Sequence, residues 1–266
     1  MRESVRNAAA LGRRIGRSGR LSDSTQRTIT PRPYPSVAIR FFGLIPAAGY
    51  GSRMGTDVPK QYLRLGSRAL LEHSIAALMS DVRVGSVLVV VAPQDRHYLA
   101  LAFPPTVRAA RVGGASRGES VRNGLRALAS EARDNDRVLV HDAARPCLSP
   151  RDLAALIDAA GADEAGGLLA APLSDTLKRA EGRMVTATVD RAELWRAQTP
   201  QLFPFGILLR ALEDCQDLTS VTDESSAVER LGLRPRLVDS IDANPKLTTP
   251  SDWPVAEAIL RAGGRW

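Results

Sequence analysis

Residues 44–61 read Leu-Ile-Pro-Ala-Ala-Gly-Tyr-Gly-Ser-Arg-Met-Gly-Thr-Asp-Val-Pro-Lys-Gln, and the rest of the chain is interpreted outward from them. An apolar run passes at once into small residues, with Gly49 and Gly51 one residue apart. Glycine has no Cβ, so its backbone can adopt positive φ and approach a phosphate group closely. Arg53 and Lys60 add fixed positive charge, and the combination indicates a loop that binds a triphosphate.

Two common phosphate-binding motifs do not fit this stretch. The P-loop pattern fails because Lys60 follows Pro59 and precedes Gln61. The dinucleotide fingerprint G-x-G-x-x-G fails because its third glycine would fall on Met54. The alternative to a phosphate loop is an ordinary glycine-rich turn between a strand and a helix.

Lysine usage favours the phosphate loop. Only three of the 36 basic residues are lysines, namely Lys60, Lys178 and Lys246. A compact ammonium, which the planar guanidinium of arginine does not replace, is therefore expected to matter at these positions. Survival of the three lysines by chance is the alternative.

The net charge of +7 resides in the first forty residues, which hold nine arginines and two acids. Residues 1–36 are rich in Arg and Ser and lack the apolar core of a secretory signal, so a disordered extension is predicted. An organellar transit peptide and a nucleic-acid-binding arm are the alternatives. The chain has no apolar stretch of membrane-spanning length. A cytoplasmic protein is expected, or a plastid-type one if the extension is a transit peptide.

Hydrophobic periodicity predicts strands alternating with helices from residue 37 to the C-terminus, in one domain of residues 37–266. Continuous apolar runs suit parallel strands that are covered on both faces. The fold class is therefore α/β with a mostly parallel sheet, whose carboxyl edge should bind the ligand. The predicted strands are 37–45, 84–91, 107–112, 137–140, 167–172 and 236–238, and the predicted helices are 70–79, one from Ser116, 150–160, 204–215, one capped by Thr222, and 251–262.

Two turns at the carboxyl edge of the predicted sheet carry further residues that could bind a ligand or a metal ion. Ser116 and Glu119 have the spacing of a capping box, and a helix start behind Gly113-Gly114 also offers free N–H groups to a ligand. Asp142 ends the strand 137–140 and can hold Mg²⁺ beside phosphate oxygens, with a helix cap as the alternative. His141 is interpreted as a core residue, and Asp95 as a solvated one.

Pro-Ala-Ala-Gly-Tyr-Gly-Ser-Arg-Met at 46–54 and Pro-Lys-Gln-Tyr at 59–62 resemble the signature of the 2-C-methyl-D-erythritol 4-phosphate cytidylyltransferase family of isoprenoid biosynthesis. Further similar segments extend the resemblance from about Val37 to the C-terminus. It implies a Rossmann-like nucleotidyltransferase fold with a twisted, mostly parallel sheet and a protruding β-hairpin arm at about 172–203. It also implies cytidylyl transfer from CTP to 2-C-methyl-D-erythritol 4-phosphate, Mg²⁺ as cofactor, and a homodimer formed through the arm.

The resemblance also assigns site residues. Ala115, where an Asp is common, and Pro245, inside Asn-Pro-Lys-Leu-Thr, depart from the family pattern. The implied catalytic residues are Arg53, Lys60 and Lys246; those binding CTP are Pro46, Ala47, Ala48, Gly49, Gly51, Gly114, Arg117 and Ser120; those binding the acceptor are Asp142, Arg145, Thr176, Arg191, Thr199 and Thr222, with Asp142 also binding the metal.

Two other functions are kept as alternatives. A cytidylyltransferase for D-ribitol 5-phosphate shares the fold and the loop, although Pro-Ala-Ala-Gly at 46–49 and Ala144 favour methylerythritol phosphate. A non-enzymatic RNA-binding protein with a basic arm is the alternative from another class. The composition and the single-domain length favour neither a nucleic-acid partner nor a membrane partner for residues 41–266.

Overall fold

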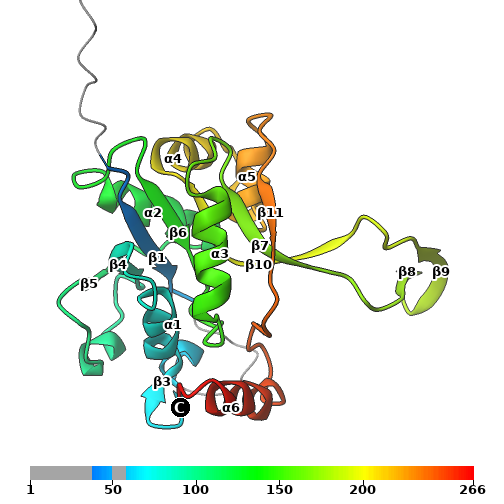
Figure 1. The fold of residues 1–266 in the computed structure, drawn as a ribbon, viewed down its shortest axis with the longest axis horizontal. Coiled ribbons are helices and arrows are strands. Elements are labelled where there is room, and N and C mark those ends of the chain that lie inside the picture. Colours follow the sequence, from blue (N-terminus) through cyan, green and yellow to red (C-terminus); the bar gives the residue numbers. More distant parts are fainter. Residues whose placement is uncertain (1–37, 50–57) are drawn as a thin grey trace, which may run out of the picture. The chain divides into compact units, whose positions relative to one another are not determined.

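The computed structural model describes residues 38–49 and 58–266, so the predicted extension and the positions of Gly51 and Arg53 lie outside the described residues. Strands and helices alternate along the chain, as the periodicity predicts (Figure 1). The strands are β1 (Phe41–Pro46), β2 (Arg64–Leu65), β3 (Arg68–Ala69), β4 (Val84–Val90), β5 (Val107–Ala110), β6 (Arg137–Val140), β7 (Gly167–Pro172), β8 (Leu177–Glu181), β9 (Met184–Val189), β10 (Trp195–Pro204) and β11 (Arg236–Asp239). The helices are α1 (Leu70–Leu78), α2 (Arg117–Leu128), α3 (Pro150–Ala160), α4 (Phe205–Glu213), α5 (Glu224–Glu229) and α6 (Asp252–Ala262), with short 3-10 turns η2 (Lys60–Tyr62), η3 (His97–Ala100) and η4 (Leu218–Ser220).

Within the described residues, the central sheet has seven strands in the order β11-β7-β10-β6-β1-β4-β5. The pairs β1–β4, β1–β6, β4–β5 and β7–β11 are parallel, which confirms the predicted mostly parallel sheet. β10 runs antiparallel between β6 and β7. No central strand was predicted at 195–204, because polar residues such as Arg196, Gln198 and Thr199 interrupt its apolar positions.

The sheet is covered on both faces, which explains its apolar strands. Neighbouring strand residues alternate between two buried clusters. Ile45, Val89 and Leu139 pack with α1 and α3, whereas Leu44, Leu88 and Val140 pack with α2, α4 and α5. Each such fully buried aliphatic side chain contributes about 1.5–3 kcal/mol. A third cluster, which includes Leu65, Leu247 and Leu260, places α6 against the start of α1.

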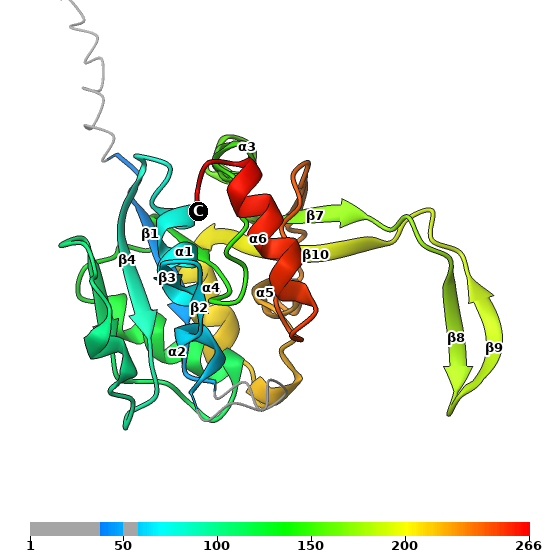
Figure 2. The same cartoon turned by 90° about the horizontal axis from the view of Figure 1, so that it is seen from below.

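β7 and β10 continue beyond the sheet into the hairpin β8–β9, which stands away from the sheet in two perpendicular views (Figures 1 and 2). Its strands are joined by a turn at Gly182, whose φ of 57° lies in the left-handed region that favours glycine. Met184 is 75% exposed and Val185 is 63% exposed. The predicted protruding hairpin is therefore present, and it buries little of its apolar surface within the described chain.

Most helix and strand boundaries agree with prediction to within a few residues, and the differences have local causes. β1 begins at Phe41 rather than at residue 37. The cap of α5 is Asp223 and not Thr222, because the Asp223 carboxylate accepts the N–H of Ser226 at 3.0 Å. In the described part of the chain, no helix is both long and apolar enough to cross a bilayer.

Candidate active site

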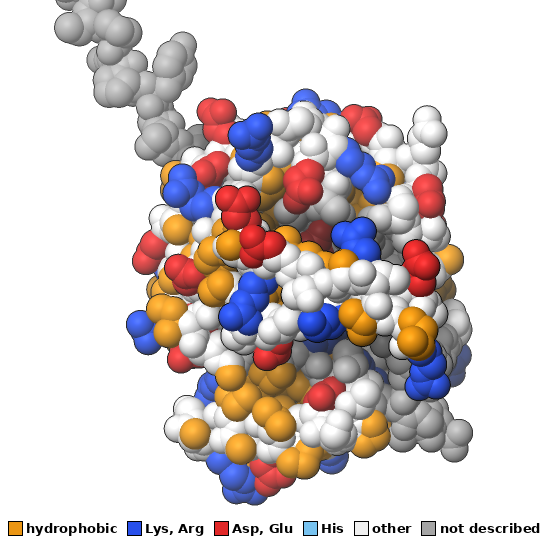
Figure 3. Space-filling view, turned by 90° about the vertical axis from the view of Figure 1, so that its right-hand side faces the viewer, with side chains coloured by type: hydrophobic (Ala, Val, Ile, Leu, Met, Phe, Trp, Pro, Cys, Tyr) orange, Lys and Arg blue, Asp and Glu red, His pale blue; other side chains and the backbone are white. Residues whose placement is uncertain are grey.

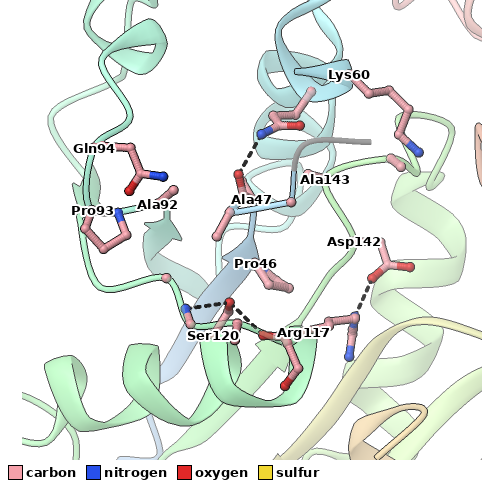
Figure 4. Close-up of a pocket in the computed structure, with 18 of the residues that line it drawn as sticks. Pro46, Ala47, Lys60, Ala92, Pro93, Gln94, Arg117, Ser120, Asp142 and Ala143 are labelled. Carbon is pink, nitrogen blue, oxygen red and sulfur yellow. Dashed lines mark hydrogen bonds and ion pairs between the residues drawn. The ribbon is translucent and has the colours of Figure 1, made fainter. Parts of the chain in front are cut away.

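A cavity of about 610 Å³ opens at the carboxyl edge of the parallel strands (Figure 4). Ligands of open α/β sheets bind at this edge because loops from successive strands converge there. Its lining comes from the ends of β1 and β4, the turn before α2, the end of β6 and a segment near the C-terminus. The lining residues used below are Ala47, Ala48, Gly49, Lys60, Gly113, Gly114, Arg117, Ser120, Asp142 and Lys246.

One wall of the cavity is made of backbone and small side chains. The N–H of Gly113 donates to Val91 O at 2.9 Å, which holds the turn tightly against the end of β4. A Cβ on Gly113 would lie 2.3 Å from the Cβ of Ala48, so only glycine fits. In contrast, a Cβ on Gly49 would meet nothing within 4 Å. Gly49 is not among the described glycines with positive φ, so at this position the missing Cβ provides open space and not a left-handed backbone.

The turn before α2 is fixed by its own side chains. Ser116 accepts the N–H of Glu119 at 3.1 Å, which confirms the predicted N-cap. The carboxylate of Glu119 accepts instead from the N–H of Ala115 at 2.8 Å, so the capping box is only half formed. Ser120 Oγ accepts the N–H of Gly114 at 3.1 Å and donates to Ser116 O at 2.9 Å. Together these bonds set the shape of the wall without a polar side chain at residue 115.

The opposite side of the cavity is a cluster of charges around Asp142. Arg117 Nε lies 3.0 Å from Asp142 Oδ1, and Lys246 Nζ lies 2.9 Å from Asp142 Oδ2. Arg145 approaches the same Oδ2 at 3.7 Å. Burial alone would raise the pKa of Asp142, but Arg117 and Lys246 outweigh it and hold that pKa well below its usual range. The carboxylate is therefore ionised and organises three cations.

Glu224 completes this cluster, and the sequence interpretation had not singled it out. Its carboxylate is 1% exposed and accepts from Arg117 Nη1 at 2.6 Å and Nη2 at 3.1 Å. Burial opposes the charged form of Arg117, but Glu224 and Asp142 overcome this and raise its pKa. Arg117 thus bridges two buried acids. In the sequence, the only signal for Glu224 is its position directly after Asp223, the cap of α5.

Two hydrogen bonds hold the hydroxyl of Thr199 against the same cluster. Thr199 Oγ1 accepts the N–H of Asp142 at 3.0 Å and lies 3.1 Å from His141 Nδ1. His141 Nε2 lies 3.0 Å from Arg145 O, which can only accept, so Nε2 carries the proton and Nδ1 accepts from Thr199. Burial lowers the pKa of His141 to about 4, so the ring is neutral. His141 is buried as predicted, but it also orients a site residue.

A smaller cavity of about 240 Å³ adjoins the charge cluster on its far side. Thr222 is exposed at its edge, while Thr199 and Gln198 are buried. The residues that line both cavities are Arg117, Asp142 and Lys246. The charge cluster therefore separates a larger compartment from a smaller one, as expected where two substrates meet.

Lys60 connects the larger cavity to the C-terminal segment. Its ammonium donates to Leu247 O at 2.5 Å, and Leu247 N donates to Ala144 O at 2.9 Å. Lys246 stays at Asp142 despite the neighbouring Pro245, so the departure from the family pattern leaves the lysine in the site. Two of the three lysines therefore lie at the cavity, and Lys178 lies on the hairpin, bonded to Thr188.

The hairpin residues are not at the cavities of their own chain. Thr176 and Arg191 are exposed, and the guanidinium of Arg191 donates to Ser174 O. Asp95, predicted to be solvated, is instead 8% exposed and accepts from Tyr62 Oη at 2.6 Å, so that prediction is wrong. Its buried partner, a tyrosine 33 residues earlier, was the signal that the sequence interpretation passed over.

The donors at the cavity suit a divalent cation only in part. Among residues 38–49 and 58–266, no group of three or more His, Cys, Asp or Glu side chains is placed to hold a metal. Asp142 supplies one ionised carboxylate at the cavity, although its two oxygens pair with Arg117 and Lys246, and both oxygens of Glu224 serve Arg117. One carboxylate fits a hard cation that is held mainly by phosphate oxygens of a ligand.

Comparison with known proteins gives a consistent result. Residues 41–262 match the family model described as 2-C-methyl-D-erythritol 4-phosphate cytidylyltransferase. Proteins of that name from Dechloromonas aromatica and Laribacter hongkongensis are 49% and 53% identical, over 84% and 83% of this chain and 98% and 96% of theirs. A crystal structure of 4-diphosphocytidyl-2C-methyl-D-erythritol synthase superposes with a TM-score of 0.73 at 44% identity, covering 85% of this chain and all of that chain. The cytidylyltransferase from Thermus thermophilus superposes with a TM-score of 0.68 at 32% identity, covering 84% and 100%.

Proposed function

Because the chain belongs to the 2-C-methyl-D-erythritol 4-phosphate cytidylyltransferase family, we propose how its two cavities carry out that family's reaction. The enzyme transfers a cytidylyl group from CTP to 2-C-methyl-D-erythritol 4-phosphate, giving 4-diphosphocytidyl-2-C-methyl-D-erythritol and pyrophosphate. The larger cavity would bind CTP and the smaller one the polyol phosphate. The observation that carries this assignment is the charge cluster shared by both cavities.

We call residues 46–49 and 113–120 the nucleotide side, since their backbone would enclose CTP. Small residues and fixed N–H groups recognise a flat base and a phosphate chain by shape. Ala115 leaves the backbone of the turn in place, which supports base recognition through the backbone. Pro46, Ala47, Ala48, Gly49, Gly114, Arg117 and Ser120 remain the proposed CTP-binding residues, together with Gly51 outside the described residues.

We call Asp142, Arg145, Thr199, Glu224 and Lys246 the acceptor side. An oxygen of the substrate phosphate would attack the α-phosphorus of CTP in line, as the bond from that phosphorus to the β-phosphate oxygen breaks. The phosphate is already ionised near neutral pH, so the site needs positioning and positive charge rather than a strong base. Lys246 and Arg145 would hold the attacking phosphate, with Thr199 and Thr222 nearby.

Lys60 and Arg53 would neutralise charge on the α-phosphoryl group and on the leaving pyrophosphate. Lys60 lines the CTP cavity, and Arg53 lies outside the described residues. Asp142 would be the protein ligand of Mg²⁺, and the bound ion would supply further neutralisation of phosphate charge.

The hairpin would complete the site of a second copy in a homodimer. Thr176 and Arg191 do not line the described cavities of their own chain, and exposed Met184 and Val185 leave apolar surface to cover. Mixing the Arg191→Ala chain with the Lys246→Ala chain tests this, because a mixed dimer would have one intact site. Recovery of activity on mixing supports the proposal, whereas no recovery despite dimer formation contradicts it.

Neither alternative function is favoured by the comparisons, since the matching family model and the relatives described above carry the name of methylerythritol phosphate cytidylyltransferase or synthase. Figure 3 shows basic and acidic side chains intermixed over the face that it presents, unlike the continuous basic surface of a nucleic-acid-binding protein.

The test of the proposed function is pyrophosphate release with CTP and Mg²⁺, comparing 2-C-methyl-D-erythritol 4-phosphate, D-ribitol 5-phosphate and no acceptor. Release only with the first is expected, and release only with the second would overturn the acceptor.

A further inference from the structure

Asp152 is a fully buried carboxylate outside both cavities, and the proposed reaction does not use it. It lies in the first turn of α3, where its N–H donates to the cap Ser149 at 3.1 Å. Both side-chain oxygens point to another segment: Ile241 N donates to Oδ1 at 3.1 Å, and Ser240 Oγ and Asp242 N donate to Oδ2 at 3.0 and 3.2 Å. These three donors are neutral, so the carboxylate is held by hydrogen bonds to one loop.

That loop leads directly into the active site. Asn244 Nδ2 donates to Thr199 O at 2.9 Å, and Arg145 Nη1 donates to Asn244 O at 2.7 Å. Two residues later, Lys246 meets Asp142. Residues 240–246 therefore follow β11, and the first three of them are held by hydrogen bonds to Asp152 of α3. The segment ends at Lys246, whose ammonium lies between the two substrates in the proposed reaction.

We propose that Asp152 is a positioning residue that fixes residues 240–242 and so sets the place of Asn244 and Lys246 opposite Asp142. The inference rests on the proposed function, since the role of Lys246 belongs to it. A carboxylate can accept on both oxygens at once, whereas an amide of the same shape presents an N–H group to one of the backbone N–H donors. A buried donor left without an acceptor would displace the loop.

The first experiment measures kcat for Asp152→Asn, alone and combined with Lys246→Ala. We expect kcat to fall about 10-fold to 100-fold in the single variant, because small misplacements of catalytic groups have effects of this size. If Asp152 acts through Lys246, the double variant loses no more activity than Lys246→Ala alone. A full additional loss in the double variant would overturn the inference.

Asp136→Asn is the matched control. Asp136 is likewise buried, 2% exposed, and accepts backbone N–H groups of Arg40 at 3.1 Å and Arg133 at 2.9 Å. It immediately precedes β6, at the strand end opposite to Asp142. We expect this variant to lower the melting temperature and to leave kcat within about 2-fold, as for a change remote from the site. Equal loss of kcat in both variants would show general destabilisation and refute a specific role.

Ser240→Ala keeps the test decisive if Asp152→Asn does not fold. It removes one of the three hydrogen bonds, so a fall in kcat of about 2-fold to 5-fold is expected, again absent when Lys246 is replaced. An unchanged kcat in this variant would count against the inference.

Amide exchange separates this inference from the proposed function. If the wild type released no pyrophosphate, the proposed function would fail, but protection of residues 240–247 would still report on Asp152. Faster exchange of that segment in Asp152→Asn, and not in Asp136→Asn, is expected. Unchanged exchange would refute the positioning role whatever the activity.

Discussion

The nucleotide side and the acceptor side of the site differ in what forms them. The nucleotide side consists of backbone and small residues from two short contiguous segments, fixed by local bonds such as Gly113 N to Val91 O. The acceptor side consists mainly of charged side chains that come from distant parts of the sequence, such as Lys246 and Asp142, whose Nζ and Oδ2 lie 2.9 Å apart. Substitutions on the nucleotide side should therefore act sterically, by changing the shape of the cavity wall. Substitutions on the acceptor side should act electrostatically, because several residues share the same ion pairs.

Lys60→Arg should have the largest effect, because Lys60 lies between the two sides and contacts the segment that carries Lys246. The planar guanidinium keeps the charge but not the position of the ammonium, so kcat should fall about 100-fold. Lys178→Arg, on the exposed hairpin, is the control and should retain its activity. Turnover near the wild-type rate in Lys60→Arg would show that charge alone suffices there.

Glu224→Gln should affect the kinetic parameters of the two substrates differently. The substitution leaves Arg117 without its buried bidentate partner, so its charge shifts toward Asp142 and weakens the hold on Lys246. We expect kcat/KM for the polyol phosphate to fall about 30-fold, the lower end of the range for truncated buried charge pairs, and KM for CTP to change less.

Glu213→Gln is the matched control for that variant. Glu213 also pairs with an arginine, Arg126 at 3.1 Å, but both side chains are about half exposed. Exposed pairs contribute little, so neither kinetic parameter should change. If Glu224→Gln raised KM for CTP more than that for the acceptor, Glu224 would act mainly through the contact of Arg117 with CTP and not through Lys246.

Gly113→Ala tests whether CTP binding depends on the shape of the cavity wall on the nucleotide side. The added methyl group would lie 2.3 Å from Ala48 Cβ and 2.9 Å from Val91 O, so the turn must move. Overpacking of this kind costs about 1–3 kcal/mol, and KM for CTP should rise about 5-fold with little change in kcat. Gly85→Ala, whose methyl group would be 3.8 Å from Phe41 O, is the control. An unchanged KM would mean that the turn adapts freely.

The smallest effect is a pH dependence of stability on the acceptor side. The folded-state pKa of His141 is about 4, below the unfolded value near 6.5. Between these values the unfolded chain binds a proton that the folded chain does not, so stability is full above pH 6.5 and declines as the pH falls toward 4.

The melting temperature measured from pH 7 to pH 4 should therefore decline less steeply in His141→Gln than in the wild type. Part of the decline should remain, because burial also lowers the pKa of His73. Identical slopes for wild type and variant would show that His141 is not the group that titrates.

The nucleotide side was largely predictable from sequence, because its residues are neighbours along the chain. The Gly-Gly turn, the Ser116 cap and the strand before Asp142 could each be identified from local spacing. On the acceptor side, the resemblance assigned Asp142, Arg145, Thr199 and Lys246, but Glu224 was missed because it meets Arg117 only after α2 and α5 pack on the same face of the sheet. The antiparallel course of β10, which brings Thr199 to Asp142, was not predicted either, because polar residues interrupt the apolar positions of 195–204.

β10 has a mechanical consequence. This one strand leaves the hairpin, pairs with β7 over residues 195–197, and reaches Thr199 without an intervening loop before it pairs with β6. The backbone of β10 is continuous from residue 195 to residue 204, although its pairing with β7 is irregular between Ala197 and Gln201. A shift of the hairpin would therefore reach Thr199 along a single strand, so whatever holds the hairpin would also affect how precisely the hydroxyl beside Asp142 is placed.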